Sequence, residues 1–457
     1  MGEKHTLYTS TELEEWDKEY LWHPFTQMKD YREEEPLIIA RGEGSFLYDI
    51  RGNKYLDGVS SLWVNLHGHG REEIKQAINN QMQELSHSTL LGLSNVPAIA
   101  LGKKLVEITP VGLNKVFYSD NGSTAVESAL KIAFQYWQQR TPPKKQKNTF
   151  VSLEHAYHGD TLGAVSVGGI DTFHTMYRPL LFSTYQIPSP YCYRCSLGKT
   201  YPSCHLECLN RAEDVIKQHH EEVSALIIEP LVQGAAGMIV APPGYLKEIR
   251  ALCSRYEILL IADEVAVGFG RTGTLFACEQ EDVAPDLLCV AKGITGGYLP
   301  IAATLATEEI YNAFLGDYSE LKTFFHGHSY TGNPLGCSAA LASLDIFEQD
   351  RTLEGLQEKI NFLERQLQPF SDLPHVGDVR QKGFMVGIEL VQDKESKKPF
   401  PLERMMGVRV IQEARKRGVI IRPLGEVIVI MPPLSISLDH LEELVEAVFY
   451  SIKKVSS

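Results

Sequence analysis

The sequence lacks any apolar run long enough to cross a membrane. No stretch of its 457 residues reaches the ~18 consecutive apolar residues that a transmembrane helix needs. The segment Met1–Tyr20 is polar and acidic, and it has no apolar centre of the kind found in secretory signal peptides. We therefore expect a cytoplasmic protein with no membrane partner.

Basic residues and cysteines are also scarce. The chain has 44 Lys and Arg against 58 Asp and Glu, which gives a formal net charge of −14. This balance argues against nucleic acid as a partner, because phosphates require a basic face. Eight cysteines in so long a chain do not suggest a disulfide scaffold. The composition is compatible with an enzyme that binds small molecules.

The length and the hydrophobic patterns predict an α/β fold with two domains. A single core rarely grows beyond roughly 250–300 residues. Residues 66–325 alternate helical patterns with short apolar segments, which predicts a large domain with a mainly parallel sheet flanked by helices. Residues 335–457 predict a smaller α+β domain, and residues 1–65 are expected to pack with it.

The expected elements can be given as residue ranges. The strands of the large domain are Val116–Ser119, Thr149–Leu153, Ala225–Ile228, Leu259–Ala262, Leu287–Val290 and Ala302–Leu305. Its helices are Ser123–Gln138, Ala212–Glu222 and Gly244–Arg255. The small domain has helical periodicity over Leu344–Phe370, strands at Phe384–Leu390 and Val427–Met431, and a closing helix from Leu438.

Two charged residues directly follow expected strands of the large domain. Asp263 follows the strand that ends at Ala262, and Lys292 follows the strand that ends at Val290. This pairing is what a pyridoxal phosphate enzyme needs. The lysine amine forms a Schiff base with the cofactor's aldehyde, and the carboxylate keeps the pyridine nitrogen protonated. The alternatives are a solvated loop lysine and a helix-capping aspartate.

Two further segments suit such a cofactor. Gly122 and Ser123 precede or open a helix, so free backbone amides and a hydroxyl could bind a phosphate there. The alternative is an ordinary helix cap. Tyr157 follows the strand Thr149–Leu153 and could stack on the pyridine ring, although an isolated tyrosine is more often structural.

Two other motifs point to different chemistry. The segment 268–273 satisfies the G-x-G-x-x-G pattern, but no long helix follows it, which argues against a nicotinamide site. Four cysteines have credible spacing for a structural zinc ion, with four reduced thiols in a packed loop as the alternative. They are Cys192, Cys195, Cys204 and Cys208. No catalytic metal is expected.

With these features in place, the chain resembles the class III, fold type I aminotransferases over nearly its whole length. The similarity rests on Asp263-Glu264-Val265 with the following 268–273 motif, on Lys292-Gly293, and on Thr331-Gly332-Asn333-Pro334. The resemblance implies pyridoxal 5'-phosphate as cofactor, an amino donor and an oxo-acid acceptor as partners, and an obligate homodimer with shared active sites.

The resemblance also implies roles for individual residues. Lys292 would carry the cofactor, Asp263 would bind its pyridinium nitrogen, and Tyr157 would stack over its ring and touch substrate. The phosphate would be bound by Gly122 and Ser123 and, from the second subunit, by His328 and Ser329. The other substrate-binding residues would be Phe25, Trp63, Gly327 and Arg422, with Arg422 pairing a substrate carboxylate.

Within the class, several segments are similar to the branch that acts in biotin biosynthesis. They include Trp22–Met28, Ser60–Trp63, Tyr157–Thr161, Val232–Met238 and Ile421–Gly425. This implies conversion of 8-amino-7-oxononanoate to 7,8-diaminononanoate, whereas the alternative is an ω-amino-acid transaminase with a pyruvate-type acceptor. Ala235 occupies a position where relatives that handle 2-oxoglutarate often carry glutamate. Phe25 stands where users of S-adenosylmethionine typically show tyrosine, and in this the chain is more similar to a branch that uses lysine. The resemblance therefore implies lysine or S-adenosylmethionine as the amino donor.

Overall fold

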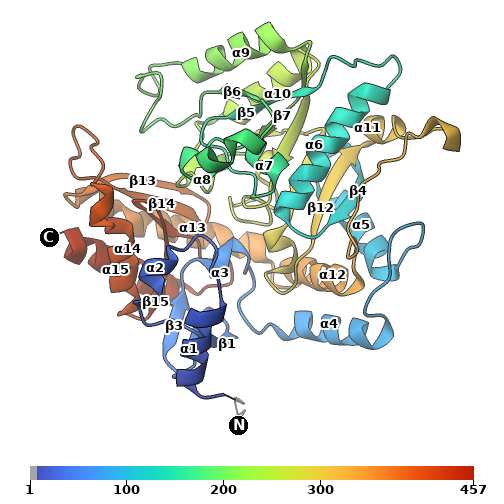
Figure 1. Cartoon of the computed structure of the whole chain (residues 1–457). Helices are drawn as coiled ribbons and strands as arrows, with labels where there is room; N and C mark the ends of the chain where they lie inside the picture. Colours follow the sequence, from blue (N-terminus) through green and yellow to red (C-terminus); the bar gives the residue numbers. More distant parts are fainter. Residues whose placement is uncertain (1–7, 457) are drawn as a thin grey trace.

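The computed structural model describes residues 8–456, and its centre is a seven-stranded sheet (Figure 1). In spatial order the strands are β4 (Leu113–Ser119), β12 (Ala302–Thr307), β11 (Leu287–Val290), β10 (Leu259–Asp263), β7 (Val223–Ile228), β5 (Thr149–Leu153) and β6 (Tyr185–Ile187). Strand β12 runs antiparallel to both of its neighbours, and the other four neighbouring pairs are parallel. The mainly parallel sheet expected from the sequence is confirmed.

The expected strands agree with the observed ones to within a few residues. Thr149–Leu153 and Leu287–Val290 are found with the same bounds. Strands β4 and β12 are longer than expected because their ends pair with each other, Thr307 opposite Leu113. Strand β6 was not expected, and it completes the edge of the sheet beside β5.

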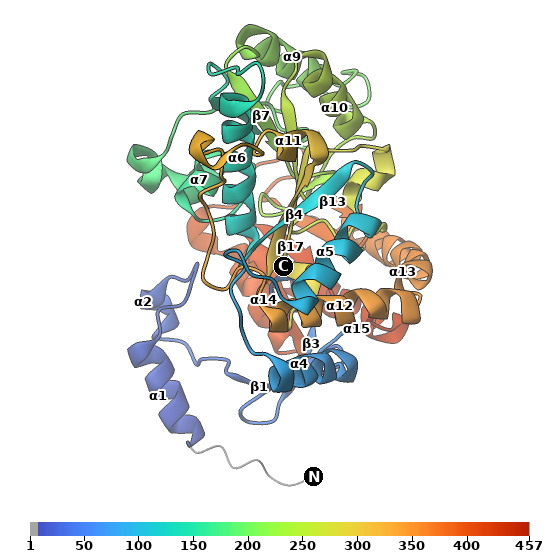
Figure 2. The same cartoon turned by 90° about the vertical axis from the view of Figure 1, so that its right-hand side faces the viewer.

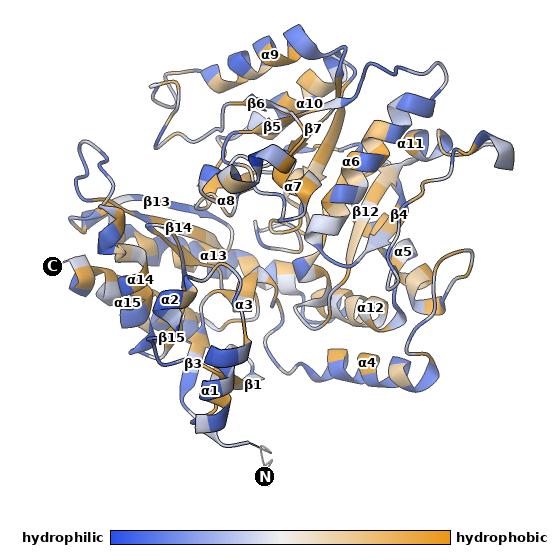
Figure 3. Cartoon of the chain, viewed as in Figure 1, coloured by the Kyte–Doolittle hydropathy of each residue, from blue (hydrophilic) through white to orange (hydrophobic). Residues whose placement is uncertain are grey.

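Helices cover both faces of this sheet, as the continuous burial of its strands requires. Ile227 and Ile261 pack with Ala129 of α6 (Gly122–Gln139) in one hydrophobic cluster. The adjacent Leu226 belongs to the other main cluster, with α10 (Tyr245–Arg255). Figure 3 shows hydrophobic colour concentrated in strands such as β7 and β12. Side chains that alternate along each strand therefore serve two opposite layers.

Two of the three expected helices of the large domain are found almost as expected. Helix α6 extends Ser123–Gln138 by one residue at each end, and α10 begins directly after Gly244. The expected helix Ala212–Glu222 is wrong at both ends, because α9 spans Glu207–His219. It ends early because the chain enters β7 at Val223.

The remaining helices of this part surround the sheet and the site. They are α3 (Ser60–Trp63), α4 (Glu72–Glu84), α5 (Val96–Ile108), α7 (Leu162–Ser166), α8 (Asp171–His174), α11 (Glu308–Asn312) and α12 (Pro334–Gln349). Within residues 8–456, no helix is both long enough and apolar enough to cross a membrane.

A second, antiparallel sheet follows in the C-terminal part. Its order is β13 (Val376–Lys382), β14 (Met385–Leu390), β17 (Val427–Ile430) and β16 (Arg422–Leu424). It is accompanied by α13 (Thr352–Leu367), α14 (Met406–Arg415) and α15 (Leu438–Ser456). The expected helical periodicity over Leu344–Phe370 is divided between two helices, because α12 ends at Gln349 and Arg351 adopts a left-handed φ of 48° before α13 begins.

The N-terminal segment joins this C-terminal part through a third sheet. Strands β1 (Ile39–Glu43), β2 (Phe46–Asp49) and β3 (Lys54–Asp57) are extended by β15 (Val419–Ile420), which runs parallel to β3. Helix α1 (Ser10–Tyr20) lies toward the end of the molecule opposite α9, and α2 (Met28–Tyr31) lies between α1 and the middle of the molecule (Figures 1 and 2). Residues 1–7 of the expected N-terminal segment lie outside the described residues, and the domain boundaries stay a prediction.

One buried lysine connects three segments that lead into strands of the seven-stranded sheet. Lys147 is 3% exposed, and its Nζ donates to the carbonyl oxygens of His220 at 2.7 Å, Val223 at 3.0 Å and Glu257 at 2.8 Å. The ammonium also lies 4.6 Å from the centroid of the Trp137 ring. Burial lowers the pKa of Lys147 to about 8. Lys147 therefore stabilises the entry to β5 and β7.

Replacing Lys147 by methionine is expected to lower the free energy of unfolding by about 2–4 kcal/mol, because three buried carbonyls lose their donor. Urea unfolding at pH 7 measures this difference. The exposed neighbour Lys145 provides the control, and Lys145→Met should leave stability within about 0.5 kcal/mol of wild type. Equal stability of the two variants would contradict the structural role of Lys147.

Candidate active site

A cavity of about 470 Å³ lies at the carboxyl ends of β10 and β11. Asp263 is the last residue of β10, and Lys292 begins a 3-10 turn two residues after the end of β11. Six of the residues expected at the site line this cavity: Trp63, Gly122, Ser123, Tyr157, Asp263 and Lys292. Parallel strands of α/β sheets bind ligands at this edge. The topology thus brings together side chains from distant parts of the sequence.

The amine of Lys292 is placed to act as a nucleophile. Its Nζ lies 5.4 Å from the centroid of the Trp63 ring. Burial lowers the pKa of Lys292, and the carboxylates of Asp263 and Glu229 oppose this shift. A lysine with a lowered pKa is more often neutral near pH 7, and only the neutral amine attacks an aldehyde.

Asp263 is a buried carboxylate held by two contacts. It is 4% exposed, its Oδ2 lies 2.7 Å from Nδ1 of His158, and its Oδ1 accepts from the backbone N–H of Val265 at 3.0 Å. The other ring nitrogen of His158 is buried without a partner. Sequence reasoning missed His158 as a site residue, although it follows Tyr157 directly. A carboxylate in this setting is suited to bind a cationic ring nitrogen.

The first turn of α6 forms another wall of the cavity. Asn121 caps the helix, with its Oδ1 accepting from the backbone N–H of Thr124 at 3.1 Å. The cap is therefore Asn121. The next two residues, Gly122 and Ser123, line the cavity with their backbone amides. A Cβ on Gly122 would lie 2.5 Å from Cγ1 of Val265, so no side chain fits there. Free amides at a helix start favour an anion.

Aromatic side chains connect the cavity to the N-terminal segment. The Tyr157 hydroxyl donates to Oδ2 of Asp160 at 2.8 Å. The ring of Phe173 lies edge-on to Tyr157 at 6.2 Å between centroids and to Phe25 at 5.3 Å. Phe25 is 58% exposed and does not line the cavity around Lys292. The structure thus places Phe25 beyond Tyr157, with Phe173, which the sequence did not indicate, between them.

Arg422 approaches the same region from the second, antiparallel sheet (β13, β14, β17 and β16), which we call the small sheet. It begins the edge strand β16 and is half-buried. Burial lowers the pKa of Arg422, and the nearby Tyr157 hydroxyl opposes this shift. Arg422 is not among the residues that line the cavity around Lys292. Its proximity to Tyr157 places a cation beside the residues expected to bind substrate.

Three expected site residues lie in a different groove. Gly327, His328 and Ser329 line a groove of about 1410 Å³, which is also bordered by residues of α5 and β4. They do not line the cavity around Lys292. The two regions meet where Nδ1 of His328 lies 3.7 Å from Oδ2 of Asp120, which does line the cavity. The groove also contains exposed apolar side chains, including Leu91 and Phe325.

Glu229 is a second residue that sequence reasoning missed. It lines the cavity, and its carboxylate accepts from the backbone N–H of Gly234 at 2.9 Å and of Tyr157 at 3.3 Å. Burial raises the pKa of Glu229 to about 7, with His158 opposing and Asp263 adding to the shift. Its position directly after β7 was the available signal, because Asp263 and Lys292 also follow strands of this sheet.

The raised pKa of Glu229 predicts a pH-dependent stability difference. An unfolded glutamate releases its proton near pH 4.5, whereas folded Glu229 keeps it to about pH 7. The contribution of Glu229 to the free energy of unfolding therefore falls as pH rises between these values. The free energy of unfolding of wild type minus that of Glu229→Gln should therefore be larger at pH 5 than at pH 7.5. Urea unfolding at both pH values measures this, and a constant difference would contradict the assignment.

Neither the glycine motif at 268–273 nor the four-cysteine segment forms the site that its pattern suggested. In the segment 268–273, the buried Arg271 donates to the carbonyl oxygens of Asn65 at 2.8 Å and Pro432 at 2.6 Å. The next helical element is only the 3-10 helix Ala277–Glu281, so the geometry of a dinucleotide site is missing from this segment. The motif instead joins three parts of the chain.

Three of the four cysteines lie in the loop after β6, and Cys208 lies in the first turn of α9; all four are free thiols that border one small cavity. Burial raises the pKa of Cys192 and raises that of Cys208 to about 11. Between residues 8 and 456, no group of three or more His, Cys, Asp or Glu side chains is arranged to hold a metal ion. The zinc interpretation therefore has no ligand set in the described structure.

Comparisons with known proteins agree on one family. The family model described as aminotransferase class-III matches residues 28–452. The adenosylmethionine-8-amino-7-oxononanoate aminotransferase of Geobacter sulfurreducens is 56% identical, over 98% of this chain and 99% of that protein. The enzyme of the same name from Aquifex aeolicus is 55% identical, over 97% of each chain.

Solved structures give the same result for the fold. The crystal structure of the adenosylmethionine-8-amino-7-oxononanoate aminotransferase from Methanocaldococcus jannaschii superposes with a TM-score of 0.93 at 51% identity, covering 98% of this chain and 99% of that one. An (S)-enantioselective omega-transaminase from Thermomicrobium roseum also has a TM-score of 0.93, at 36% identity and with the same coverage. The backbone alone therefore does not separate these two activities.

Proposed function

The chain belongs to the class III aminotransferases, and from this premise we propose that it transfers an amino group to 8-amino-7-oxononanoate, giving 7,8-diaminononanoate in biotin biosynthesis. The names of relatives at 51–56% identity, which match nearly its whole length, support this substrate. Its cofactor is pyridoxal 5'-phosphate, as in the transaminases whose fold it shares. The observation that carries the proposal is the cavity that joins Lys292 to Asp263.

The residues of the cavity fit this cofactor. Lys292 would hold the aldehyde carbon, and the buried Asp263 would hold the protonated pyridine nitrogen. The amides of Gly122 and Ser123 at the start of α6 would bind the phosphate, because the first amides of a helix have no partner within it. When bound, the cofactor supplies an electron sink for the charge that develops on the substrate carbon.

Lys292 would have a second task while its amine is free. The amine would act first as a general base and then as a general acid, taking a proton from the substrate and returning it. The lowered pKa of Lys292 increases the fraction of neutral amine that can accept a proton. Asp263, held in place by His158, would face the ring nitrogen and keep its proton on it.

Residues in and beside the cavity would orient the substrate. Tyr157 and Trp63 line it, and the cation of Arg422 lies near the Tyr157 hydroxyl. We assign Arg422 to the carboxylate of 8-amino-7-oxononanoate, because a guanidinium binds a carboxylate through two parallel hydrogen bonds. The donor and the acceptor use the same cavity in turn, which gives ping-pong kinetics.

The amino donor is proposed to be S-adenosylmethionine or lysine. The names of the relatives favour S-adenosylmethionine. Phe25 favours lysine, because it offers no hydroxyl for a polar donor and packs against Phe173. The test follows the visible absorbance band of the cofactor bound to Lys292 while each compound is added separately. The true donor should bleach this band, and the other compound should leave it unchanged.

We also propose that the active enzyme is an obligate homodimer with shared sites. Support comes from the groove that contains Gly327, His328 and Ser329, because it exposes apolar side chains such as Leu91 and Phe325. In a dimer, His328 and Ser329 would reach the phosphate of the other subunit. Sedimentation velocity should give twice the chain mass, and a monomer would refute this part of the proposal. The cytoplasmic location stays a prediction.

The second candidate function is an ω-amino-acid transaminase with a pyruvate-type acceptor. It is favoured by the equally close superposition on the Thermomicrobium roseum omega-transaminase. The deciding experiment offers 8-amino-7-oxononanoate or pyruvate to the loaded enzyme and quantifies the aminated product by mass spectrometry. Turnover of 8-amino-7-oxononanoate alone supports the proposed function, whereas turnover of pyruvate alone replaces it with the second candidate.

A further inference from the structure

A short hairpin forms the wall of the cavity that contains Ala235. Strands β8 (Val232–Gln233) and β9 (Ile239–Val240) are antiparallel, and the five residues 234–238 between them form the hairpin tip. Ala235 in this tip lines the cavity around Lys292. A Cβ on Gly234 would lie 3.5 Å from Cζ3 of Trp63, so the tip packs against that ring.

The two shoulders of the tip are held by different side chains. On one side, the backbone N–H of Gly234 donates to Oε1 of Glu229 at 2.9 Å. On the other side, Arg380 donates through Nε to the carbonyl oxygens of Gly237 at 2.8 Å and Met238 at 3.0 Å, and through Nη2 to Gly237 at 2.5 Å. Ala235 lies between these two attachments.

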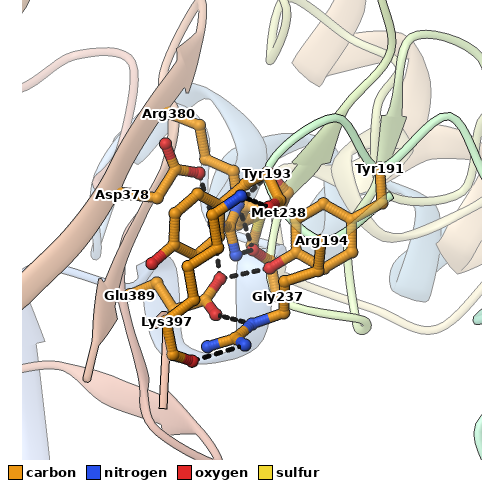
Figure 4. A network of polar contacts seen from close by, with 9 residues as sticks. All are labelled: Tyr191, Tyr193, Arg194, Gly237, Met238, Asp378, Arg380, Glu389 and Lys397. Atoms are coloured by element: carbon orange, nitrogen blue, oxygen red, sulfur yellow. Dashed lines mark hydrogen bonds and ion pairs between the residues drawn. The ribbon is translucent and has the colours of Figure 1, made fainter. Parts of the chain in front are cut away.

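Arg380 belongs to the small sheet, and its remaining donors anchor it there (Figure 4). Its Nη1 donates to Oδ2 of Asp378 at 2.7 Å and to Oε2 of Glu389 at 2.8 Å. Arg380 is 8% exposed. One planar guanidinium thus joins two carboxylates of the small sheet to two carbonyls of the cavity wall, a span that a lysine ammonium cannot cover.

Glu389 has other partners that do not reach the tip. Nε of Arg194 donates to its Oε1 at 2.5 Å, and the Tyr191 hydroxyl also donates to its carboxylate. Arg194 therefore binds the same carboxylate as Arg380, but its other hydrogen bond goes to the carbonyl oxygen of Lys397 and not to the hairpin tip (Figure 4). When Arg380 is removed, Glu389 keeps these two donors, so the small sheet retains a partner for its buried charge.

We propose that Arg380 is a positioning residue of the substrate cavity, which fixes the 234–238 tip to the small sheet and so holds Ala235 beside Trp63. The tip also packs closely against β14. A Cβ on Gly387 would lie 2.8 Å from the Gly237 carbonyl oxygen, so only glycine allows this approach. The effect on catalysis rests on the proposed function, whereas the effect on the tip does not.

The test compares Arg380→Lys and Arg380→Met with Arg194→Met, all loaded with pyridoxal phosphate. Hydrogen–deuterium exchange of the peptide 232–241 should become about tenfold faster in both Arg380 variants, because the tip loses its donors on one side. The KM for 8-amino-7-oxononanoate should rise about tenfold while kcat changes less than about threefold, and the cofactor band should not change. Arg194→Met should leave exchange and KM at wild-type values.

Two outcomes overturn the proposal. The first is wild-type exchange of the peptide 232–241 in both Arg380 variants. The second is an equal acceleration in Arg194→Met, which would make the effect a general one of the charge network. If the wild-type protein transaminates neither acceptor, the proposed function fails, but the exchange comparison still decides the role of Arg380. Arg380→Lys keeps a positive charge, so it serves the test if Arg380→Met does not fold.

Discussion

Replacing Lys292 by alanine is expected to lower kcat by at least about a thousandfold. The variant loses the amine that binds the cofactor's aldehyde and the amine that moves the proton, and proton transfer alone contributes about 10²–10⁴-fold. The pocket itself should persist, because Lys292 begins a short turn whose following residues are buried in the core. Steady-state kinetics at saturating donor and the visible cofactor band measure the two losses separately.

Lys147→Met is the matched control for this variant. Lys147 is also buried and also has a lowered pKa, but it binds backbone carbonyls far along the sheet from Asp263. It should keep wild-type kcat in spite of its lower stability. Substantial turnover by Lys292→Ala, within about tenfold of wild type, would remove Lys292 from the mechanism.

Replacing Asp263 by asparagine is expected to lower kcat by about 10²–10³-fold, because an amide does not hold a proton on the pyridine nitrogen. The side chain keeps its size, so the contact with His158 and the packing around it should persist. Cofactor binding should weaken but remain detectable. Kinetics at saturating cofactor separate the loss of kcat from the loss of binding.

The adjacent residue supplies a control for Asp263→Asn. Glu264 is fully buried, but its carboxylate accepts from the backbone N–H groups of Ala277 at 2.7 Å and Cys278 at 2.8 Å, away from the cavity. Glu264→Gln should reduce stability and leave kcat within about threefold of wild type. A smaller loss of kcat in Asp263→Asn than in Glu264→Gln would contradict the assigned role.

Local patterns were sufficient to predict the centre of the site. Asp263 and Lys292 each follow a short apolar run, and a parallel sheet places the carboxyl ends of such runs at one edge. The Gly122–Ser123 segment likewise predicts the start of a helix. These signals depend on neighbours in the sequence, and for that reason they could be read without the structure.

Contacts between distant segments could not be predicted in this way. His158 is 105 residues from Asp263 along the chain, and Arg380 is 143 residues from Gly237. Each looks like an ordinary polar residue in its own segment. The break between α12 and α13 was missed for a related reason, because Asp350 and Arg351 carry no helix-breaking signal and only Arg351's left-handed backbone separates the two helices.

The most direct test of the proposed function is the visible spectrum of the purified protein loaded with pyridoxal phosphate, followed as a donor and then an acceptor are added. The account predicts a band from Lys292-bound cofactor, its loss with lysine or S-adenosylmethionine, and its return with 8-amino-7-oxononanoate but not with pyruvate. Failure of the band to form would contradict the Lys292–Asp263 site. Its return with pyruvate alone would contradict the substrate.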